Sequence, residues 1–560
     1  MCSFHAKPEK LNRCGECIVI RLARWFGLFV SVVLLLIAMP AVSVTMPEAQ
    51  ALRKQLEKYL TATTQESGLS ALQRFYVGRD YQPVWFQSDS ASASASVLHD
   101  IALEFIANAE AEGLDSHDYQ LHHLRQMRSD NYSAVPYELE FQTTRALLML
   151  AEDMRLGQLS AKEVDPDWHI PQPLFDPVIF LLEAVASDHF RQSLYDLSPK
   201  IPSYQLLKQA LAKYRDLVAR QIAWTRIPAF FDIQPNTSHA VIPLVRARIA
   251  EAFHTHGTAE YNLPPTQSNN YDGDLVNAIK TFQAQHGLNT DGIIGRNTRR
   301  ALNMTPAEKV QQLRLNMERL RWLPRDLGER YLLVNIAGFQ LAAVKYDQQI
   351  LTMRIIVGKY FRSTPSFSSN ISHFILNPFW NVPASIAKKD LLPKQQKDPT
   401  FFATRGIKVY QGYDYREASI DPDAIDWLVI KKEFPYVLRQ DPGAKNALGT
   451  IKFILPNPFS IYLHDTPTKS LFDSEIRTFS SGCIRLEHPV ALAGFAMEGD
   501  RTQTELTAQI HTGKTATVNL PEPLPTYVVY LTTWIDSQRK IHYSPDTYGR
   551  DKRALSLARW

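Results

Sequence analysis

A cysteine and a histidine late in the chain have the residue types and the spacing of a nucleophile and its base. Cys483 follows Gly482 in a short Ser-Ser-Gly turn, and His464, 19 positions earlier, follows the β-like residues 461–463. A thiol is mostly protonated near pH 7, and a neighbouring imidazole can remove its proton. The spacing suits a hairpin-like return that brings the two side chains together. The amides of Ser481, Gly482 and Cys483 are then candidates for an oxyanion hole. We therefore predict nucleophilic catalysis at Cys483.

The other three cysteines do not compete for this role. Cys2, Cys14 and Cys17 all lie in the basic segment at the start of the chain. Cys14 and Cys17 have the spacing of a zinc or redox pair, but no second ligand pair lies nearby. The residue type of Cys483 alone leaves a buried, inert thiol open as an alternative. The Gly-Cys turn and the preceding histidine favour the nucleophile.

Residues 1–46 are predicted to export the protein, as a signal peptide or as an N-terminal membrane anchor. Lysines and arginines precede an apolar run over residues 25–39, which is followed by Pro40 and the small-x-small residues 41–43. This order is that of a secretory signal. Extended to residue 44, the run has about 20 residues, enough for a retained membrane span. Both alternatives place the chain after Met46 outside the cytoplasm.

The composition narrows the class of protein. A chain of 560 residues predicts about three to four domains, and 45% hydrophobic with 21% charged residues is ordinary for a globular protein. These values exclude a wholly disordered chain and a polytopic membrane protein. The formal net charge of +4 lacks the clustered basic excess of a nucleic-acid binder, so no nucleic acid is expected as a partner.

The hydrophobic pattern predicts a multidomain α+β fold. Residues 47–235 have helical periodicity and are expected to form a helical scaffold domain, and residues 306–327 an amphipathic linking helix. Residues 328–545 hold short β-rich runs with turns between them, which predicts a mostly-β domain. Residues 384–441 within it form a Lys-rich, less regular insertion. Long insertions beside a site are often lids, and we expect one here.

A small separate unit is predicted over residues 236–305. Ile279, Phe282 and Leu288 give one apolar helical face, and residues 291–298 then read Asp-Gly-x-x-Gly-x-x-Thr before another short helix. This order resembles the small three-helix peptidoglycan-binding domain. A generic helical spacer is the alternative.

The region around Cys483 resembles the L,D-transpeptidase (YkuD-type) catalytic domain. His464 is followed by Ser-Ser-Gly-Cys-Ile-Arg-Leu at residues 480–486, and further matches are residues 357–359, 364–365, 377–383 and 440–449. The scaffold, the peptidoglycan-binding unit and the insertion make the chain similar to the large Gram-negative members of this family. The resemblance implies that Cys483 is the nucleophile and His464 the general base, and that the backbone carbonyl of Asp465 orients the imidazole.

The chain departs from the family pattern at one position. Many members have a second histidine where this chain has Ser481, so the assignment of the base rests on His464 alone. The resemblance implies oxyanion or substrate-binding roles for further residues, which are Ser480, Ser481, Gly482, Tyr462 and Arg485. For Arg485 two roles stay open, namely contact with the substrate and packing of the Cys turn.

The resemblance also implies a reaction and a location. An exported enzyme of this family joins peptidoglycan stem peptides by 3→3 cross-links, through a cysteinyl thioester and with release of D-alanine. The partners are then a tetrapeptide donor stem and a diamino-acid amine as acceptor, in the periplasm, and carbapenem-type β-lactams are expected to acylate the cysteine. An L,D-carboxypeptidase that passes the same thioester to water is one alternative. A non-catalytic peptidoglycan-binding protein is the other.

No metal or cofactor is expected from the sequence. His117, His122 and His123 lie close together but lack an accompanying cysteine or carboxylate ligand pattern, so solvated or capping histidines are the preferred interpretation. Residues 508–515 fit a relaxed phosphate-loop pattern, but its first glycine is absent and no buried strand precedes it.

Overall fold

The computed structural model describes most of the chain after the predicted export segment. It covers residues 46–63, 68–86, 93–131, 136–221, 224, 226–256, 263, 266–431, 433–558 and 560. The predicted signal or anchor lies outside these residues, apart from Met46. Over the described ranges, none of the helices combines the length and the apolar character needed to span a membrane.

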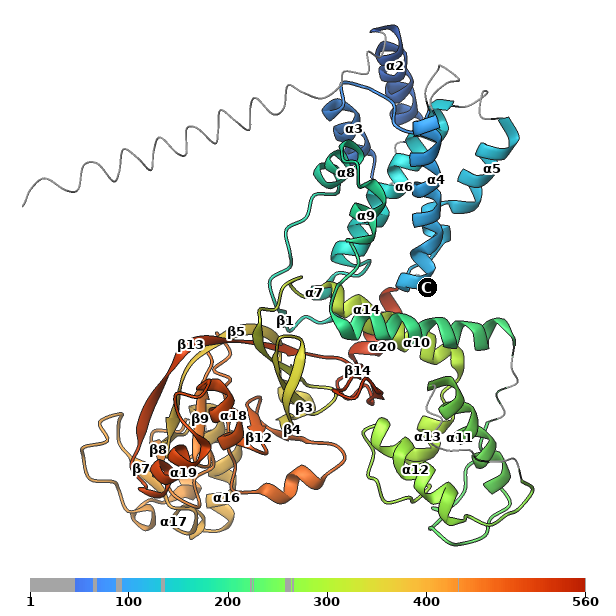
Figure 1. Ribbon diagram of the computed structural model, residues 1–560. Helices are drawn as coiled ribbons and strands as arrows, with labels where there is room; N and C mark the ends of the chain where they lie inside the picture. Colours follow the sequence, from blue (N-terminus) through green and yellow to red (C-terminus); the bar gives the residue numbers. More distant parts are fainter. Residues whose placement is uncertain are drawn as a thin grey trace, which may run out of the picture.

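The N-terminal part is a bundle of helices around one long central helix (Figure 1). The helices are α2 (Met46–Ala62), α3 (Leu69–Gly78), α4 (Ala93–Ala107), α5 (Leu121–Asn131), α6 (Pro136–Leu156), α8 (Pro177–Ala186) and α9 (Phe190–Tyr195). The short helix α7 (Ala161–Val164) lies outside this bundle, in a separate apolar cluster with Trp322. Helix α6 is buried along most of its length because its apolar residues recur at helical spacing. Its buried Glu140 accepts hydrogen bonds from the Val84 and Trp85 amides at 2.6 and 2.8 Å. These bonds tie the segment after α3 to the core.

Two packed helices carry the peptidoglycan-binding-like unit between them. Helix α10 (Pro202–Ala219) and helix α14 (Pro306–Arg321) contact each other, and the unit of α11 (Ile242–His256), α12 (Gly273–Gln285) and α13 (Arg296–Leu302) lies between them in sequence. A capping box of Thr305 and Glu308 begins α14. Ile279 and Phe282 lie in the core of the inserted unit, as predicted, whereas Leu288 lies beyond the end of α12 and outside that core.

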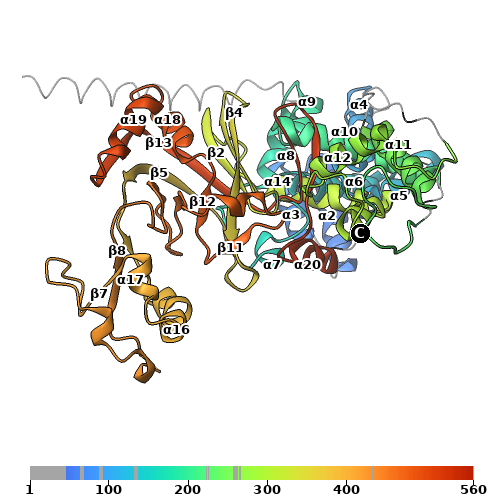
Figure 2. The ribbon, with the colours of Figure 1, turned by 90° about the horizontal axis from the view of Figure 1, so that it is seen from below.

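The catalytic-type domain is a sheet that closes on itself. Its strands are β1 (Trp168–His169), β5 (Ser366–Leu376), β13 (Ala516–Val529), β2 (Arg330–Asn335), β3 (Gln340–Lys345), β4 (Gln348–Gly358), β12 (Ile484–Leu486), β10 (Leu463–His464) and β9 (Ile451–Ile454), in that order, with β11 (Thr478–Ser480) beside β4. Because β9 pairs with both β10 and β5, the strands from β5 to β9 form a barrel. A buried apolar core fills the barrel, and α18 (Pro489–Ala496) and α19 (Gln503–His511) contribute to it. Figure 2 shows these two helices side by side. The predicted α+β class is confirmed.

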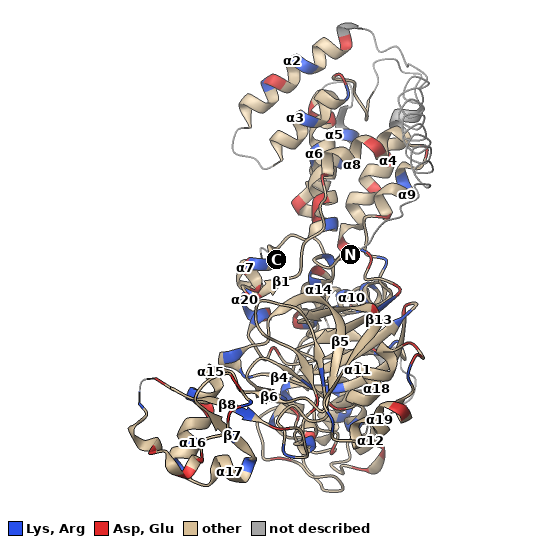
Figure 3. Ribbon diagram, turned by 90° about the vertical axis from the view of Figure 1, so that its left-hand side faces the viewer, with Lys and Arg blue, Asp and Glu red and all other residues tan. Residues whose placement is uncertain are grey.

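The predicted lid is more regular than its sequence indicates. A three-stranded sheet of β6 (Trp380–Asn381), β8 (Val437–Gln440) and β7 (Ile407–Tyr410) packs with α15 (Ala384–Ile386), a π-helix η4 (Ala387–Leu391), α16 (Leu392–Lys397) and α17 (Phe401–Arg405). Phe402, Trp427 and Leu438 belong to a separate hydrophobic core. In Figure 3 this unit projects from the barrel. The apolar residues are too widely spaced in sequence to predict this core from periodicity.

The end of the chain returns to the scaffold. After the hairpin of β14 (Thr533–Ile535) and β15 (Ile541–Tyr543), helix α20 (Arg550–Leu557) contacts α14 and α7. Leu531, Tyr543 and Ala554 share one buried cluster with Trp322 of the linking region. The barrel and the scaffold are therefore held together by the C-terminal segment.

Candidate active site

The strand register places the predicted base between two cations. His464 pairs with Lys452 of β9 on one side and with Arg485 of β12 on the other. The preceding residue of β10, Leu463, is fully buried in the barrel core. Side chains alternate along a strand, and directly paired residues point to the same side of the sheet. Lys452, His464 and Arg485 therefore lie on the opposite face, here called the site face.

Cys483 lies on the same face because it precedes Arg485 by two residues. The Ile484 amide donates to the Tyr462 carbonyl at 3.1 Å, which sets Tyr462 opposite Cys483. The Tyr462 hydroxyl forms a hydrogen bond with the thiol. The sulfur also lies 3.8 Å from the Ser460 carbonyl oxygen. Cys483 and His464 thus lie on one face of neighbouring strands. Within the part of the chain that the structure describes, no hydrogen bond joins these two side chains.

The turn that carries Cys483, residues 481–483 and here called the Cys loop, is held by its neighbours. Thr364 Oγ1 donates to the Gly482 carbonyl at 2.8 Å. The Gly482 amide donates to Ser480 Oγ at 3.0 Å, and this hydroxyl donates to the Cys483 carbonyl. Gly482 has φ +122, a backbone conformation that favours glycine.

The hydrogen bond from Gly482 changes the predicted oxyanion hole. We expected three amides, and in this structure one of them already donates to Ser480 Oγ. No hydrogen bond from the Ser481 or Cys483 amide is found in the part of the chain that the structure describes. These two amides are left for a substrate oxygen, and Ser480 is placed as a support of the loop.

The imidazole of His464 is fixed in one orientation. Its Nδ1 contacts the backbone carbonyl oxygen of Asp465. A carbonyl only accepts, so Nδ1 carries the proton and Nε2 is left as the proton acceptor. Burial lowers the pKa of His464 to about 3, and the charges of Arg485 and Lys452 act in the same direction. The imidazole is therefore neutral near pH 7.

The carboxylate of Asp465 is engaged elsewhere. It accepts hydrogen bonds from the Thr450 amide and hydroxyl, each at 2.8 Å, and forms an ion pair with Lys469 at 2.7 Å. A Cβ on Gly449 would overlap this carboxylate, so the close approach requires glycine. Only the backbone carbonyl of Asp465 serves His464.

The resting thiol is held in its neutral form. Burial raises the pKa of Cys483, while its hydrogen bonds with Tyr462 and the positive charges of Lys452 and Arg485 lower it, with a net rise above the usual value. Nucleophilic attack therefore requires removal of the thiol proton during the reaction.

Lys452 is a site-face residue that the sequence reasoning missed. Its Nζ lies 3.9 Å from the centroid of the Tyr462 ring. Burial lowers the pKa of Lys452, and the charge of Cys483 raises it. A lysine inside the apolar strand Ile451–Ile454 was the available signal, because a half-buried charge in a strand needs a reason.

Arg362 is a second missed residue, and it lies at the Cys loop. Its guanidinium donates to Ser481 Oγ at 2.8 Å and is ion-paired with Asp390 of the π-helix η4. Ser481 itself is exposed. The position where many family members have histidine is thus linked to the lid.

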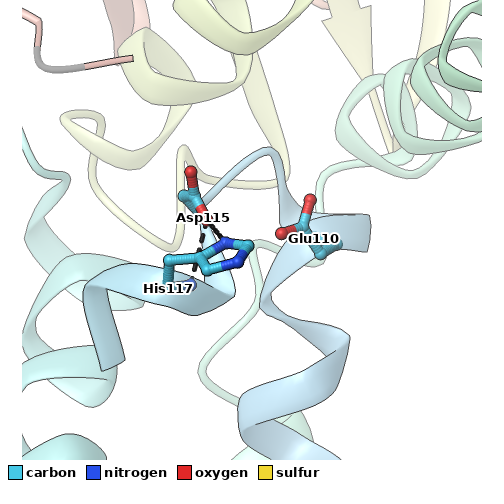
Figure 4. Close-up of side chains that lie close together, drawn as sticks. All are labelled: Glu110, Asp115 and His117. Carbon is cyan, nitrogen blue, oxygen red and sulfur yellow. Dashed lines mark hydrogen bonds and ion pairs between the residues drawn. The ribbon is translucent and has the colours of Figure 1, made fainter. Parts of the chain in front are cut away.

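One cluster outside this site has metal-ligand residue types. Figure 4 shows Glu110, Asp115 and His117, and His117 Nδ1 lies 2.8 Å from the Asp115 carboxylate. Glu110 is already ion-paired with Arg215 at 2.9 Å, and Asp115 caps the amide of His117. His122 and His123 are not part of the cluster, but two carboxylates do accompany His117, contrary to the sequence analysis. We interpret it as a surface charge network.

Three parts of the chain match families of known proteins. Family models match residues 70–211 as "Scaffold domain", residues 258–302 as "Putative peptidoglycan binding domain" and residues 329–506 as "L,D-transpeptidase catalytic domain". A curated protein of Haemophilus influenzae named "Putative L,D-transpeptidase" is 36% identical over 250 residues, which are 44% of this chain and 50% of that protein. The chain therefore spans about half of this relative's length.

A solved structure is also similar. It is the L,D-transpeptidase (residues 123–326) from Xylanimonas cellulosilytica, with 11% sequence identity, a TM-score of 0.16 and coverage of 54% of this chain and 99% of that one. The assignment of the parts comes from the family models. Family models thus match a scaffold domain, a peptidoglycan-binding domain and a YkuD-type L,D-transpeptidase catalytic domain, the three kinds of domain that the sequence predicted.

Proposed function

We propose that this protein is a periplasmic L,D-transpeptidase that forms 3→3 cross-links between peptidoglycan stem peptides through a thioester on Cys483. The observation that carries the proposal is the shared face of Cys483 and a neutral His464, whose Nδ1 is fixed by the Asp465 carbonyl. A proton-accepting Nε2 on the same face as a protonated thiol is the arrangement from which general-base activation of a cysteine can start.

The first half-reaction transfers the donor stem to the enzyme. His464 Nε2 accepts the thiol proton, and Cys483 Sγ attacks the carbonyl of the third, diamino-acid residue of a tetrapeptide. The amides of Ser481 and Cys483 stabilise the tetrahedral oxyanion. The bond to the terminal D-alanine breaks, and its nitrogen leaves with the proton that His464 carries.

The second half-reaction transfers the stem to an acceptor. The side-chain amine of a second diamino-acid residue attacks the thioester, and His464 accepts its proton. Sγ leaves as thiolate and is reprotonated. One amide has been broken and one formed, so no ATP is needed outside the cytoplasm.

The lid favours the amine over water in this proposal. It stands beside the Cys loop through the contacts of Arg362 with Ser481 and Asp390. Closure over the thioester would exclude water, which would otherwise give an L,D-carboxypeptidase.

The test is to mix the exported domains with tetrapeptide muropeptides and analyse the products by mass spectrometry. We expect a dimer that has lost one alanine. Cys483→Ala must make none. If wild type yields only tripeptide monomers, the protein is a carboxypeptidase. If it yields neither product and no carbapenem adduct, the non-catalytic alternative holds.

A further inference from the structure

Lys452 and Arg485 place two positive charges on the site face. Within the described part of the chain, neither Lys452 nor Arg485 forms an ion pair with a carboxylate. Asp465, the residue after His464, already binds Thr450 and Lys469 through its carboxylate. The Arg485 Nε is also buried without a hydrogen-bond partner.

This arrangement is unusual because partly buried charges are normally paired. Burial lowers the pKa of both Lys452 and Arg485, and the one group that raises either pKa is the Cys483 thiol. That thiol is neutral in the resting state. The positive charge on the site face can therefore bind an anionic group of the substrate.

The register of the strands around His464 indicates which group of the substrate is this anion. Lys452 and Arg485 flank His464 from the two neighbouring strands, each about 4.8 Å away along the hydrogen-bonding direction. In the proposed reaction, His464 protonates the nitrogen of the leaving D-alanine. The carboxylate of that residue is separated from this nitrogen by one carbon atom only. This carboxylate is therefore the negative group of the donor that must lie near His464.

We propose that Lys452 and Arg485 form a carboxylate subsite that binds the terminal carboxylate of the donor's leaving residue. The inference rests on the proposed function and deepens it, because it names the residues that read the length of the donor. In a tetrapeptide the carboxylate directly follows the scissile bond. In a pentapeptide it lies one residue, about 3.6 Å, further away, and the subsite would meet a neutral amide instead.

The same subsite serves the acceptor. Attack by the acceptor amine is the reverse of amine departure, so the incoming nitrogen occupies the place that the leaving nitrogen has vacated. An acceptor whose amine and a carboxylate share one carbon atom then places its carboxylate between Lys452 and Arg485. The structure thus favours diamino acids with a carboxylate beside the distal amine over simple alkylamines.

The experiment compares two donors and several variants of the full exported chain. The donors are a tetrapeptide stem with a free terminal carboxylate and the same stem ending in D-alaninamide. Acylation is followed as release of D-alanine or D-alaninamide and as the mass of the acyl-enzyme. A charge-assisted hydrogen bond of typical strength predicts a wild-type preference for the acid of about tenfold or more in kcat/KM.

Lys452→Met should lose most of this preference. We expect it to lower kcat/KM for the acid donor about tenfold and to leave the amide donor within about twofold. Lys452→Arg should keep the preference, and the exposed Lys514→Met should behave as wild type. The rate of carbapenem acylation in each variant reports whether the Cys483 site is still folded and reactive.

The outcomes separate the two proposals. An equal loss for both donors in Lys452→Met, with slower thiol alkylation, would mean that Lys452 acts on the thiol and would overturn the subsite. Equal rates for both donors in wild type would overturn it too. Acylation followed by hydrolysis would overturn cross-linking and leave the subsite intact. Absence of acylation by either donor would overturn the proposed function itself.

Discussion

Arg362 donates to Ser481 Oγ at 2.8 Å while it is ion-paired with Asp390, so one side chain joins the Cys loop to the lid. Arg362 lies at the end of the 3₁₀ helix η3 (Tyr360–Arg362), which follows directly on β4. The Lys359 amide at the start of this helix donates to the Ser480 carbonyl at 3.0 Å. The lid is therefore linked to the Cys loop through a short hydrogen-bonded segment.

Breaking this link should change the fate of the thioester. We expect Asp390→Asn to raise the ratio of tripeptide monomer to cross-linked dimer a few-fold, because a partly buried ion pair is worth roughly 1 kcal/mol and its loss loosens the lid. Product analysis by mass spectrometry measures this ratio. Asp414→Asn is the matched control, since Asp414 pairs with the adjacent Arg416 within the lid. An unchanged ratio in Asp390→Asn would show that the ion pair does not govern access of water.

Removal of the imidazole should abolish acylation. No second histidine adjoins Cys483 in the sequence, so we expect His464→Ala to lower the rate of carbapenem and tetrapeptide acylation by about 10²–10⁴. The mass of the intact protein after timed incubation reports the adduct. His488→Ala, at an exposed position of the same domain, should keep its activity. Full activity of His464→Ala would mean that another group takes the thiol proton.

Burial of neutral His464 predicts how stability depends on pH. Its pKa is lowered to about 3 in the folded protein, below the value of about 6.5 in an unfolded chain. Between these values the unfolded chain binds more protons, so the free energy of unfolding falls as the pH falls from 6.5 towards 3. The effect is absent above pH 6.5.

Thermal unfolding checks this prediction. We expect His464→Asn to lose less stability than wild type between pH 7 and pH 4. The buried His99 of the scaffold, with its pKa lowered to about 4, contributes in the same direction in both proteins and cancels in the comparison. Equal losses in the two proteins would contradict a neutral, buried His464.

Gly358 is predicted to be sensitive to the smallest substitution. A Cβ at this position would overlap the Arg362 carbonyl and approach the Thr364 amide to 3.0 Å, and both are backbone atoms. We expect Gly358→Ala to lower the stability by about 1–3 kcal/mol, as overpacking typically does, and to slow acylation by displacing the Cys loop. Gly412→Ala, in open space on the lid, should do neither. Chemical denaturation and the acylation rate are the measurements.

The pieces of this fold that depend on local sequence could be predicted. Helical periodicity located the scaffold and the linking helix, and the turn before Cys483 with the strand before His464 identified the candidate pair. The role of Lys452 could not be predicted in this way. Its position beside His464 depends on the pairing of β9, β10 and β12, which come from three separate segments and meet because the barrel closes.

The contacts of the Cys loop could not be predicted from the sequence for a similar reason. Thr364, Arg362 and Asp390 lie about a hundred positions before Cys483, and no local pattern joins them. The use of the Gly482 amide by Ser480 is local, but it depends on the rotamer of a serine. A spacing argument counts amides and does not say which of them are already occupied.

The limits of the matched families in this chain differ from the limits of its paired strands. Strand β1 falls within the matched scaffold, residues 70–211, yet Trp168 and His169 pair with β5 of the barrel. Strand β13 lies beyond the matched catalytic domain, which ends at residue 506, yet it stands between β5 and β2. A gene fragment cut at these limits would expose unpaired strand edges. The peptidoglycan-binding unit, in contrast, enters and leaves between two packed helices. Removal of this unit would break no strand pairing of the barrel, although its His286 stacks on Tyr543 of β15. Scaffold and barrel, in contrast, share the pairing of β1 with β5.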